Sequence, residues 1–216
     1  MAAASDARPR FRGVSHRVAF FLALPLAVAL SFEVDTDAGR AAAVAFGTSA
    51  AVMFGASALY HGVPWPDHRR RWLRRLDHAG IYLLIAGSYT PVGLLVLQGP
   101  WRFVVLGIVW IGAAAAIALK FLWVDAPTWL SAAIGIVLGW VAVAVFPQIF
   151  DRVGIAGSVL VLTGGIAYTA GAVVYALRRP DPFPTVFGYH EVFHALVIVA
   201  VACQYSAIAF FVLPEH

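Results

Sequence analysis

Cysteine and charge are both scarce in this chain. Only one of its 216 residues is a cysteine, Cys203, so no disulfide can form within the chain. Cys203 lies inside an apolar run, which favours a small buried hydrophobic residue over a reactive thiol. Charged residues make up 12% of the sequence, whereas soluble domains contain about 25%. The chain also lacks a polar stretch long enough for a soluble domain, which excludes a soluble globular protein.

Hydrophobic residues fill most of the sequence instead. They make up 62% of it, and a transmembrane helix requires about 17–25 predominantly apolar residues. Seven stretches meet this length, and short segments with charged residues, Pro and Gly separate them. We therefore predict an all-α protein, a bundle of seven transmembrane helices. The predicted spans are residues 15–34, 41–62, 77–97, 101–121, 127–147, 154–177 and 188–213.

The N-terminal segment has a different character. Residues 1–14 are polar and basic, and we expect a disordered tail ahead of a membrane domain at residues 15–216. Basic residues followed by an apolar run are also typical of a signal peptide. No clear small-x-small cleavage pattern precedes Glu33, so we favour a first span that stays in the protein.

The distribution of Lys and Arg predicts the orientation of the bundle. With the N-terminus inside, twelve of the 15 Lys and Arg residues fall in inner segments; the outer ones hold Arg40, Arg102 and Arg152. The positive-inside rule therefore predicts a cytoplasmic N-terminus and a C-terminus outside. The basic run at residues 68–75 lies between two spans, so we interpret it as a topology and anionic-lipid signal. We expect no nucleic-acid partner.

Polar residues inside a membrane are costly to bury and therefore indicate function. His190 and His194 are four residues apart, which places both imidazoles on one helix face. His61 ends the second span, Asp77 begins the third, and the histidine pair begins the seventh, all at the cytoplasmic depth. We therefore predict one convergent site there. The intramembrane polar residues considered are Ser57, His61, Asp77, His78, His190, Glu191 and His194.

The residue types in this group favour a zinc site. Three histidines with an open position are typical of catalytic zinc, and nitrogen ligands favour Zn2+ over calcium or magnesium. We predict that His61, His190 and His194 bind Zn2+. Asp77 is either a direct ligand or a catalytic group that contacts the metal through water and acts as general base. Ser57, one turn before His61, either orients Asp77, stabilises an oxyanion or bonds a carbonyl of its own helix.

A competing motif overlaps the histidine pair. Residues 190–194 also fit H-E-x-x-H, the zinc-protease pattern in which the glutamate is the general base. An intramembrane metalloprotease of this type would use Asp77 as its third ligand. That reading leaves His61 unexplained, which counts against it.

We assign structural roles to the remaining polar residues. Glu191 is expected to pair with Arg178 or Arg179 at the cytoplasmic surface if it is not catalytic. His78 points about 100° away from Asp77 on a helix, so we expect a hydrogen bond to a neighbouring span. Three other histidines lie in polar ends or loops and carry no signal: His16, His68 and His216.

Several segments of the chain resemble motifs of one known family. Residues 57–61 (SALYH) resemble the S-x3-H motif of the hemolysin III family, the bacterial branch of the progestin and adiponectin receptor (PAQR) superfamily. Residues 76–82 and 85–91 are similar to its third-span signature, and residues 179–194 to its seventh-span motif. The resemblance covers essentially the whole chain after residue 14.

This resemblance implies a multi-pass protein of the bacterial plasma membrane with seven helices and a cytoplasmic N-terminus. It implies zinc held by His61, His190 and His194, with Asp77 bridging through water. Adiponectin receptors and the related alkaline ceramidases imply hydrolysis of a lipid amide. The bacterial branch is connected with haemolysis, that is cytolysis, and with membrane lipid homeostasis.

Three functions remain open from the sequence. The first is a zinc-dependent hydrolase that acts on an amide or ester of an inner-leaflet lipid, with Asp77 as the proton acceptor. The second is a hemolysin, channel or lipid-responsive regulator with a structural zinc, although the fourth and fifth spans lack the polar stripe of a pore. The third is the H-E-x-x-H protease. The sequence leaves the oligomeric state open.

Overall fold

The structure, a computed structural model, describes residues 9–32 and 34–215. Its regular elements are all helical, which confirms the predicted all-α class for this part of the chain. The α-helices are α1 (Val14–Phe32), α2 (Asp37–Gly62), α3 (Asp67–Pro91), α4 (Trp101–Leu122), α5 (Thr128–Gly139), α6 (Phe146–Leu177) and α7 (Tyr189–Ala207). Short π or 3-10 segments extend some of them, at Val92–Val96, Trp140–Val145, Ile208–Val212 and Leu213–Glu215.

Local sequence explains where several helices begin and end. Thr36 caps α2 by accepting a hydrogen bond from the backbone N–H of Gly39 at 3.1 Å. Pro91 lacks a backbone N–H, and the regular part of α3 ends there before the wider turns of the π segment. α3 begins at Asp67 and not at the predicted residue 77, because the arginine-rich segment continues the helix beyond the apolar stretch.

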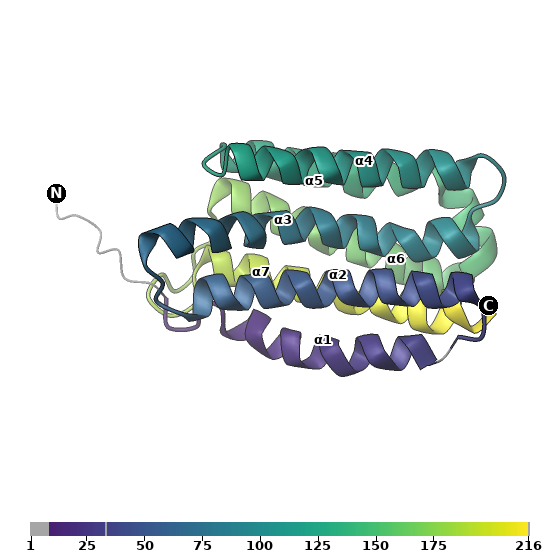
Figure 1. Cartoon of the computed structure of the whole chain (residues 1–216), viewed down its shortest axis with the longest axis horizontal. Coiled ribbons are helices and arrows are strands. Elements are labelled where there is room, and N and C mark those ends of the chain that lie inside the picture. Colours follow the sequence, from purple (N-terminus) through teal and green to yellow (C-terminus); the bar gives the residue numbers. More distant parts are fainter. Residues whose placement is uncertain (1–8, 33, 216) are drawn as a thin grey trace.

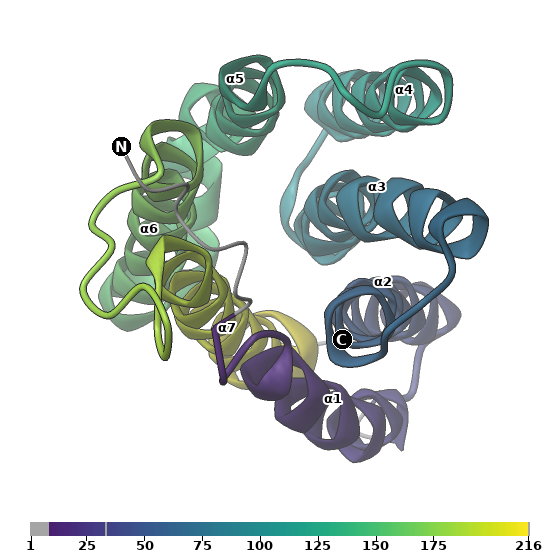
Figure 2. The same ribbon diagram turned by 90° about the vertical axis from the view of Figure 1, so that its left-hand side faces the viewer.

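The helices form a closed ring. They run side by side along the long axis of the molecule (Figure 1). Each helix packs against its neighbours in the chain, and α7 also packs against α1, which closes the ring (Figure 2). α3 contacts α5 as well as α4. This arrangement brings the end of α2 and the starts of α3 and α7 together at one end of the bundle.

The number of membrane-spanning helices differs from the sequence expectation. In the described residues, six helices are long and apolar enough to cross a membrane, whereas seven spans were predicted. The difference arises at Thr128–Leu177, which forms one 50-residue run. Gly154 breaks this run with φ of +65°, a left-handed conformation that glycine adopts readily. α5 packs alongside α6.

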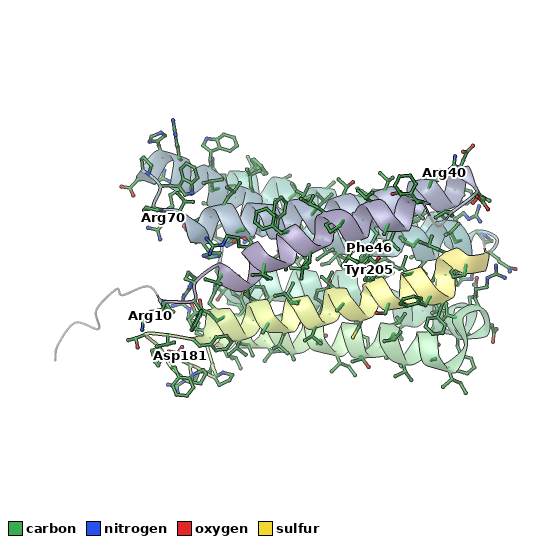
Figure 3. All side chains as sticks on the ribbon, turned by 90° about the horizontal axis from the view of Figure 1, so that it is seen from below. Arg10, Arg40, Phe46, Arg70, Asp181 and Tyr205 are labelled. Atoms are coloured by element: carbon green, nitrogen blue, oxygen red, sulfur yellow. The ribbon has the colours of Figure 1, made fainter. Side chains whose placement is uncertain are left out.

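The outer surface of the ring is apolar along its middle. Large hydrophobic side chains such as Phe21, Ile111 and Ile166 are exposed there. Charged side chains gather at the two ends of the bundle, for example Arg70 at one end and Arg40 at the other (Figure 3). An apolar belt between two charged ends is the surface expected of a protein that is surrounded by lipid. The structure therefore agrees with a membrane-embedded helical protein.

The segment before α1 contacts the connection between α6 and α7. Within the tail expected at residues 1–14, residues 9–14 belong to the described part of the chain and residues 1–8 lie outside it. The N–H of Arg10 donates to the Thr185 carbonyl at 3.0 Å, and that of Phe11 donates to the Val186 carbonyl at 3.2 Å. These partners lie far away in the sequence, so composition gave no sign of them. We call residues 9–13 the N-terminal strap.

Candidate metal centre

Three histidines from two helices meet at one end of the bundle. His61 comes from the last turn of α2, and His190 and His194 come from the first two turns of α7. One ring nitrogen from each lies within 4.8 Å of the other two. The Nε2 atoms of His61 and His190 are 3.1 Å apart. The sequence analysis therefore named three histidines that the structure brings together.

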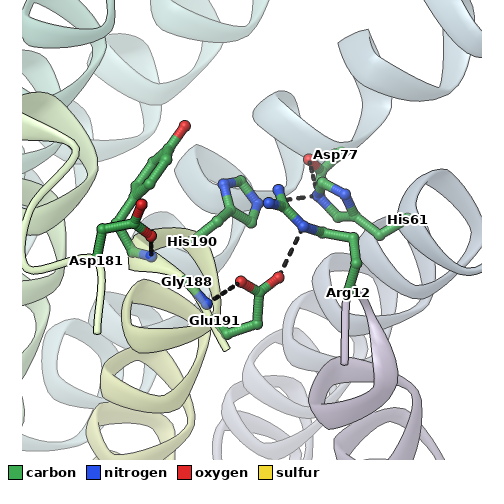
Figure 4. A network of polar contacts seen from close by, with 8 residues as sticks. Arg12, His61, Asp77, Asp181, Gly188, His190 and Glu191 are labelled. Carbon is green, nitrogen blue, oxygen red and sulfur yellow. Dashed lines mark hydrogen bonds and ion pairs between the residues drawn. The ribbon is translucent and has the colours of Figure 1, made fainter. Parts of the chain in front are cut away.

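Asp77 joins the cluster from the side of α3. Its Oδ2 lies 3.5 Å from His61 Nε2, and only 8% of the residue is exposed (Figure 4). His190 and His194 are equally well buried, at 8% and 1% exposure. The four predicted residues thus share one buried site, although α7 lies far from α2 and α3 in the sequence.

The donor set fits a metal ion. Ligand nitrogens about 2.0–2.1 Å from a tetrahedral zinc lie roughly 3.4 Å apart, close to the 3.1 Å between His61 and His190. The Nδ1 of His194 is buried and has no hydrogen-bond partner among the described residues. Buried polar atoms normally find a partner. The three histidines can therefore hold a metal ion.

One residue of the site was missed by the sequence analysis. His16 on α1 was given no role, yet it is 2% exposed and its ring stacks on His194 with centroids 3.7 Å apart. It lies near the start of the first predicted span, at the same end of the bundle as the other histidines. The argument from shared membrane depth applies equally to His16. Its position beside the basic N-terminal tail, however, led us to place it in a polar segment outside the membrane.

The position of Ser57 also differs from the expectation. Its Oγ pairs with His16 Nδ1 at 2.8 Å, and the side chain is buried. None of the three predicted partners, Asp77, an oxyanion or a carbonyl of its own helix, takes part in this contact. Ser57 therefore acts on the cluster indirectly, because it fixes the ring that stacks on His194.

Glu191 faces away from the predicted arginines. Its Oε1 forms an ion pair with Arg12 Nε of the N-terminal strap at 2.7 Å, and its Oε2 accepts a hydrogen bond from the Gly188 N–H at 2.8 Å (Figure 4). The expected pairing with Arg178 or Arg179 is not found. The second contact caps the start of α7. Both carboxylate oxygens are thus engaged in structural contacts, which disfavours the general-base role of the H-E-x-x-H reading.

His78 lies beside the cluster without a hydrogen bond from its Nδ1. The ring packs edge-on against Tyr175 of α6, with centroids 6.5 Å apart. Its Nδ1 is buried and has no partner among the described residues, so the expected hydrogen bond to a neighbouring span is not found for that atom.

A cavity of about 70 Å³ adjoins the metal centre. Asp77, His190 and His194 line one part of it, and Lys120 and Ser131 line another. A second cavity of about 150 Å³, lined mainly by apolar side chains, lies next to the first. Both cavities share wall residues, among them Met53, Phe193 and Val197. A polar site therefore opens beside an apolar space inside the bundle.

Comparison with known proteins finds relatives that match most of this chain. Hemolysin-3 of Bacillus cereus is 30% identical over 204 residues, which cover 93% of this chain and 90% of that protein. Hemolysin-3 homolog of Bacillus subtilis (strain 168) is 29% identical over 206 residues, or 92% and 91% of the two chains. The Adiponectin receptor protein of Drosophila melanogaster is 29% identical over 184 residues, which cover 76% of this chain and 41% of that protein.

The family described as "Haemolysin-III related" matches residues 5–205, which is most of the chain. The match to the Drosophila receptor supports the predicted link to the PAQR superfamily. His61, Asp77, His190 and His194, which lie within the motifs that carried the resemblance, meet at one end of the bundle. By sequence the chain thus belongs to the haemolysin-III-related family.

Proposed function

We propose that this protein is a zinc-dependent hydrolase of the plasma membrane that cleaves an amide or ester bond of a lipid. The observation that carries the proposal is the buried group of His61, His190, His194 and Asp77 beside an apolar cavity. Nitrogen ligands of this kind favour zinc. An apolar space next to a metal centre suits an acyl chain, which must leave the bilayer to reach the site.

The proposal includes seven membrane crossings with the N-terminus in the cytoplasm. Gly154 divides the run at residues 128–177 into two parts, 128–153 and 155–177. At about 1.5 Å per residue, each part is long enough to cross a hydrocarbon layer of about 30 Å. The distribution of Lys and Arg supports a cytoplasmic position for the metal centre. The lipid would then enter from the inner leaflet.

Each group of residues in the site has a separate role in the proposed reaction. The three histidines would hold a zinc ion, which would supply Lewis acidity for activating water near neutral pH and for polarising a carbonyl. Asp77 is placed to accept a proton at its carboxylate during attack and to return it to the leaving group. The helices around the cavities supply mainly apolar walls. His16 and Ser57 hold His194 in position.

A second function is favoured by the names of the relatives. Two of them are called hemolysins, which favours a cytolytic or lipid-responsive protein in which the metal is structural. The two functions differ in what metal removal does. A structural metal stabilises the fold, so its removal would destabilise the bundle. A catalytic metal can be removed with loss of turnover and little loss of stability.

The test is to measure zinc content and lipid-amide hydrolysis on the purified protein and on matched variants. We expect His61→Ala to lose zinc, and Asp77→Asn to keep zinc but lose turnover by about 100-fold or more. Glu191→Gln should keep turnover if its role is structural. His68→Ala removes an exposed histidine and serves as the control.

Each alternative outcome has a distinct meaning. Full turnover in Asp77→Asn would contradict the proposed proton transfer. A zinc-loaded protein with no turnover on any lipid, which unfolds when the metal is chelated, would favour the structural role. Absence of zinc in the parent protein would remove the basis of both functions.

A further inference from the structure

A buried lysine lies across the cavity from the metal centre and has no role in the proposed chemistry. Lys120, in the last turn of α4, is 1% exposed. It lines the cavity of about 70 Å³ that Asp77, His190 and His194 also line. A basic side chain buried within a membrane-spanning helix is costly and indicates a function.

The protein itself offers Lys120 little compensation for its charge. Its ammonium donates a hydrogen bond to Ser131 Oγ of α5, which leaves two of its three N–H groups. No ion pair links it to a carboxylate in residues 9–32 and 34–215. The nearby Asp125 is held by Arg74 at 2.5 Å and is exposed to solvent.

The surroundings show that the position of Lys120 is built into the fold. The Tyr82 hydroxyl donates to the carbonyl of Ser131 at 3.2 Å and so ties the start of α5 to α3. A lysine whose only role was to interact with the negative end of the α4 helix dipole could do so from the outer surface of the ring. Leu122 in the same turn occupies such an outward position and is 86% exposed. Lys120 instead lies on the inner side of the ring, where a ligand in the cavity would meet its ammonium.

We propose that Lys120 and Ser131 form a binding subsite for an oxyanion, a carboxylate or phosphate, on the polar end of the lipid. The inference deepens the proposed function, on which it rests, by naming the substrate class as lipid amides or esters with a negative charge near the scissile bond. The acyl chain occupies the larger apolar cavity, the scissile bond lies at the metal centre, and the oxyanion contacts Lys120. Ser131 orients the ammonium and offers its hydroxyl to the same oxyanion.

The experiment measures binding and so does not depend on turnover. The probes are hexadecyloxyacetate and 2-hexadecyloxyethanol, which have similar chains and differ in a carboxylate against a hydroxyl. Neither contains an amide or ester bond. Their affinities are measured on the detergent-solubilised protein, on Lys120→Met and on Arg102→Met. Arg102 is a basic residue at the other end of α4 and controls for loss of one positive charge.

We expect the parent protein to prefer the carboxylate about tenfold, since a hydrogen bond to a charged group is worth roughly that factor. Lys120→Met should lose this preference and keep its affinity for the alcohol, whereas Arg102→Met should keep both. Equal affinities for the two probes, or an unchanged preference in Lys120→Met, would overturn the proposal. Lys120→Met replaces the lysine with an unbranched side chain that is one atom shorter and uncharged, and its fold is checked by thermal unfolding.

Two further measurements distinguish a free ion from a lipid headgroup as the source of the oxyanion, and the subsite proposal from the hydrolase proposal. Stabilisation by inorganic phosphate alone, lost in Lys120→Met, would assign the subsite to a free ion and overturn its assignment to a lipid. Turnover of a neutral lipid amide without any carboxylate preference would support the hydrolase and contradict the subsite. A carboxylate preference without turnover on any lipid would support the subsite and contradict the hydrolase.

Discussion

At the scale of single residues, the metal centre depends on side chains that do not bind the metal. His16 stacks on His194 and bonds Ser57, and all three are at most 2% exposed. In a packed interior, such contacts fix the orientation of the His194 ring, which is a proposed metal ligand. The pairing joins α1, α2 and α7 through one stacked and one hydrogen-bonded contact.

The expected consequence is a loss of metal affinity without loss of a ligand. Residues that orient a metal-binding histidine typically change affinity by about 10–100-fold. We therefore expect Ser57→Ala and His16→Phe each to weaken zinc binding by about tenfold, measured by competition with a chelator. His68→Phe provides the control on an exposed histidine. Unchanged affinity in both variants would show that the stacked pair has no influence on the metal.

At the scale of elements, the N-terminal strap lies against the metal centre and completes the end of the bundle. Arg12 pairs with the buried Glu191, and Gly13 lies against His61. Gly13 has φ of +78°, and a Cβ added there would come within 2.7 Å of His61 Cβ. Only glycine adopts this positive φ without strain and leaves room for the His61 side chain.

Two neighbouring glycines give a matched test of this contact. Gly13→Ala should lower the free energy of unfolding by about 1–2 kcal/mol from the left-handed backbone alone, and should displace His61 and weaken zinc binding. Gly62→Ala lies next to the same histidine, but its added Cβ meets nothing within 4 Å. We expect it to be neutral or slightly stabilising, because alanine favours a helix over glycine. Thermal unfolding and zinc affinity are the measurements, and equal effects of both variants would contradict the strap contact.

At the scale of the whole molecule, the ring of helices separates two environments. Its outer belt is apolar, while its interior holds the histidine cluster and the two cavities. The excess of Lys and Arg at one end is the basis of the orientation proposed above. The proposed topology places the metal centre at that end.

Cysteine labelling tests the topology directly. In a Cys203→Ala background the chain has no cysteine, so a single new cysteine reports its own side of the membrane. We expect Asp151→Cys to react with an impermeant maleimide in intact cells, and Arg69→Cys to react only after permeabilisation. Both positions are exposed in the structure. The reverse pattern would invert the orientation, and labelling of both from outside would contradict the number of crossings.

The sequence by itself determined the helical class, the approximate positions of the apolar helices and the membership of His61, Asp77, His190 and His194 in one site. These features follow from local rules, because apolar runs of a given length cross a bilayer and buried polar groups need partners. The predicted boundary between the spans at 127–147 and 154–177 rests on the charged residues Asp151 and Arg152, and the left-handed Gly154 breaks the 50-residue run at the same place.

The tertiary structure alone decided the contacts around that site. His16 pairs with Ser57, 41 residues away in the sequence. Arg12 forms an ion pair with Glu191, and Lys120 lines the cavity. Such pairings depend on the rotation of each helix about its axis and on how closely neighbouring helices pack. Neither property produces a periodic pattern in the amino-acid sequence. The proposed ligands could be named from the cost of burying polar groups and from their spacing, whereas the residues that contact them could be identified only from the packed ring of helices.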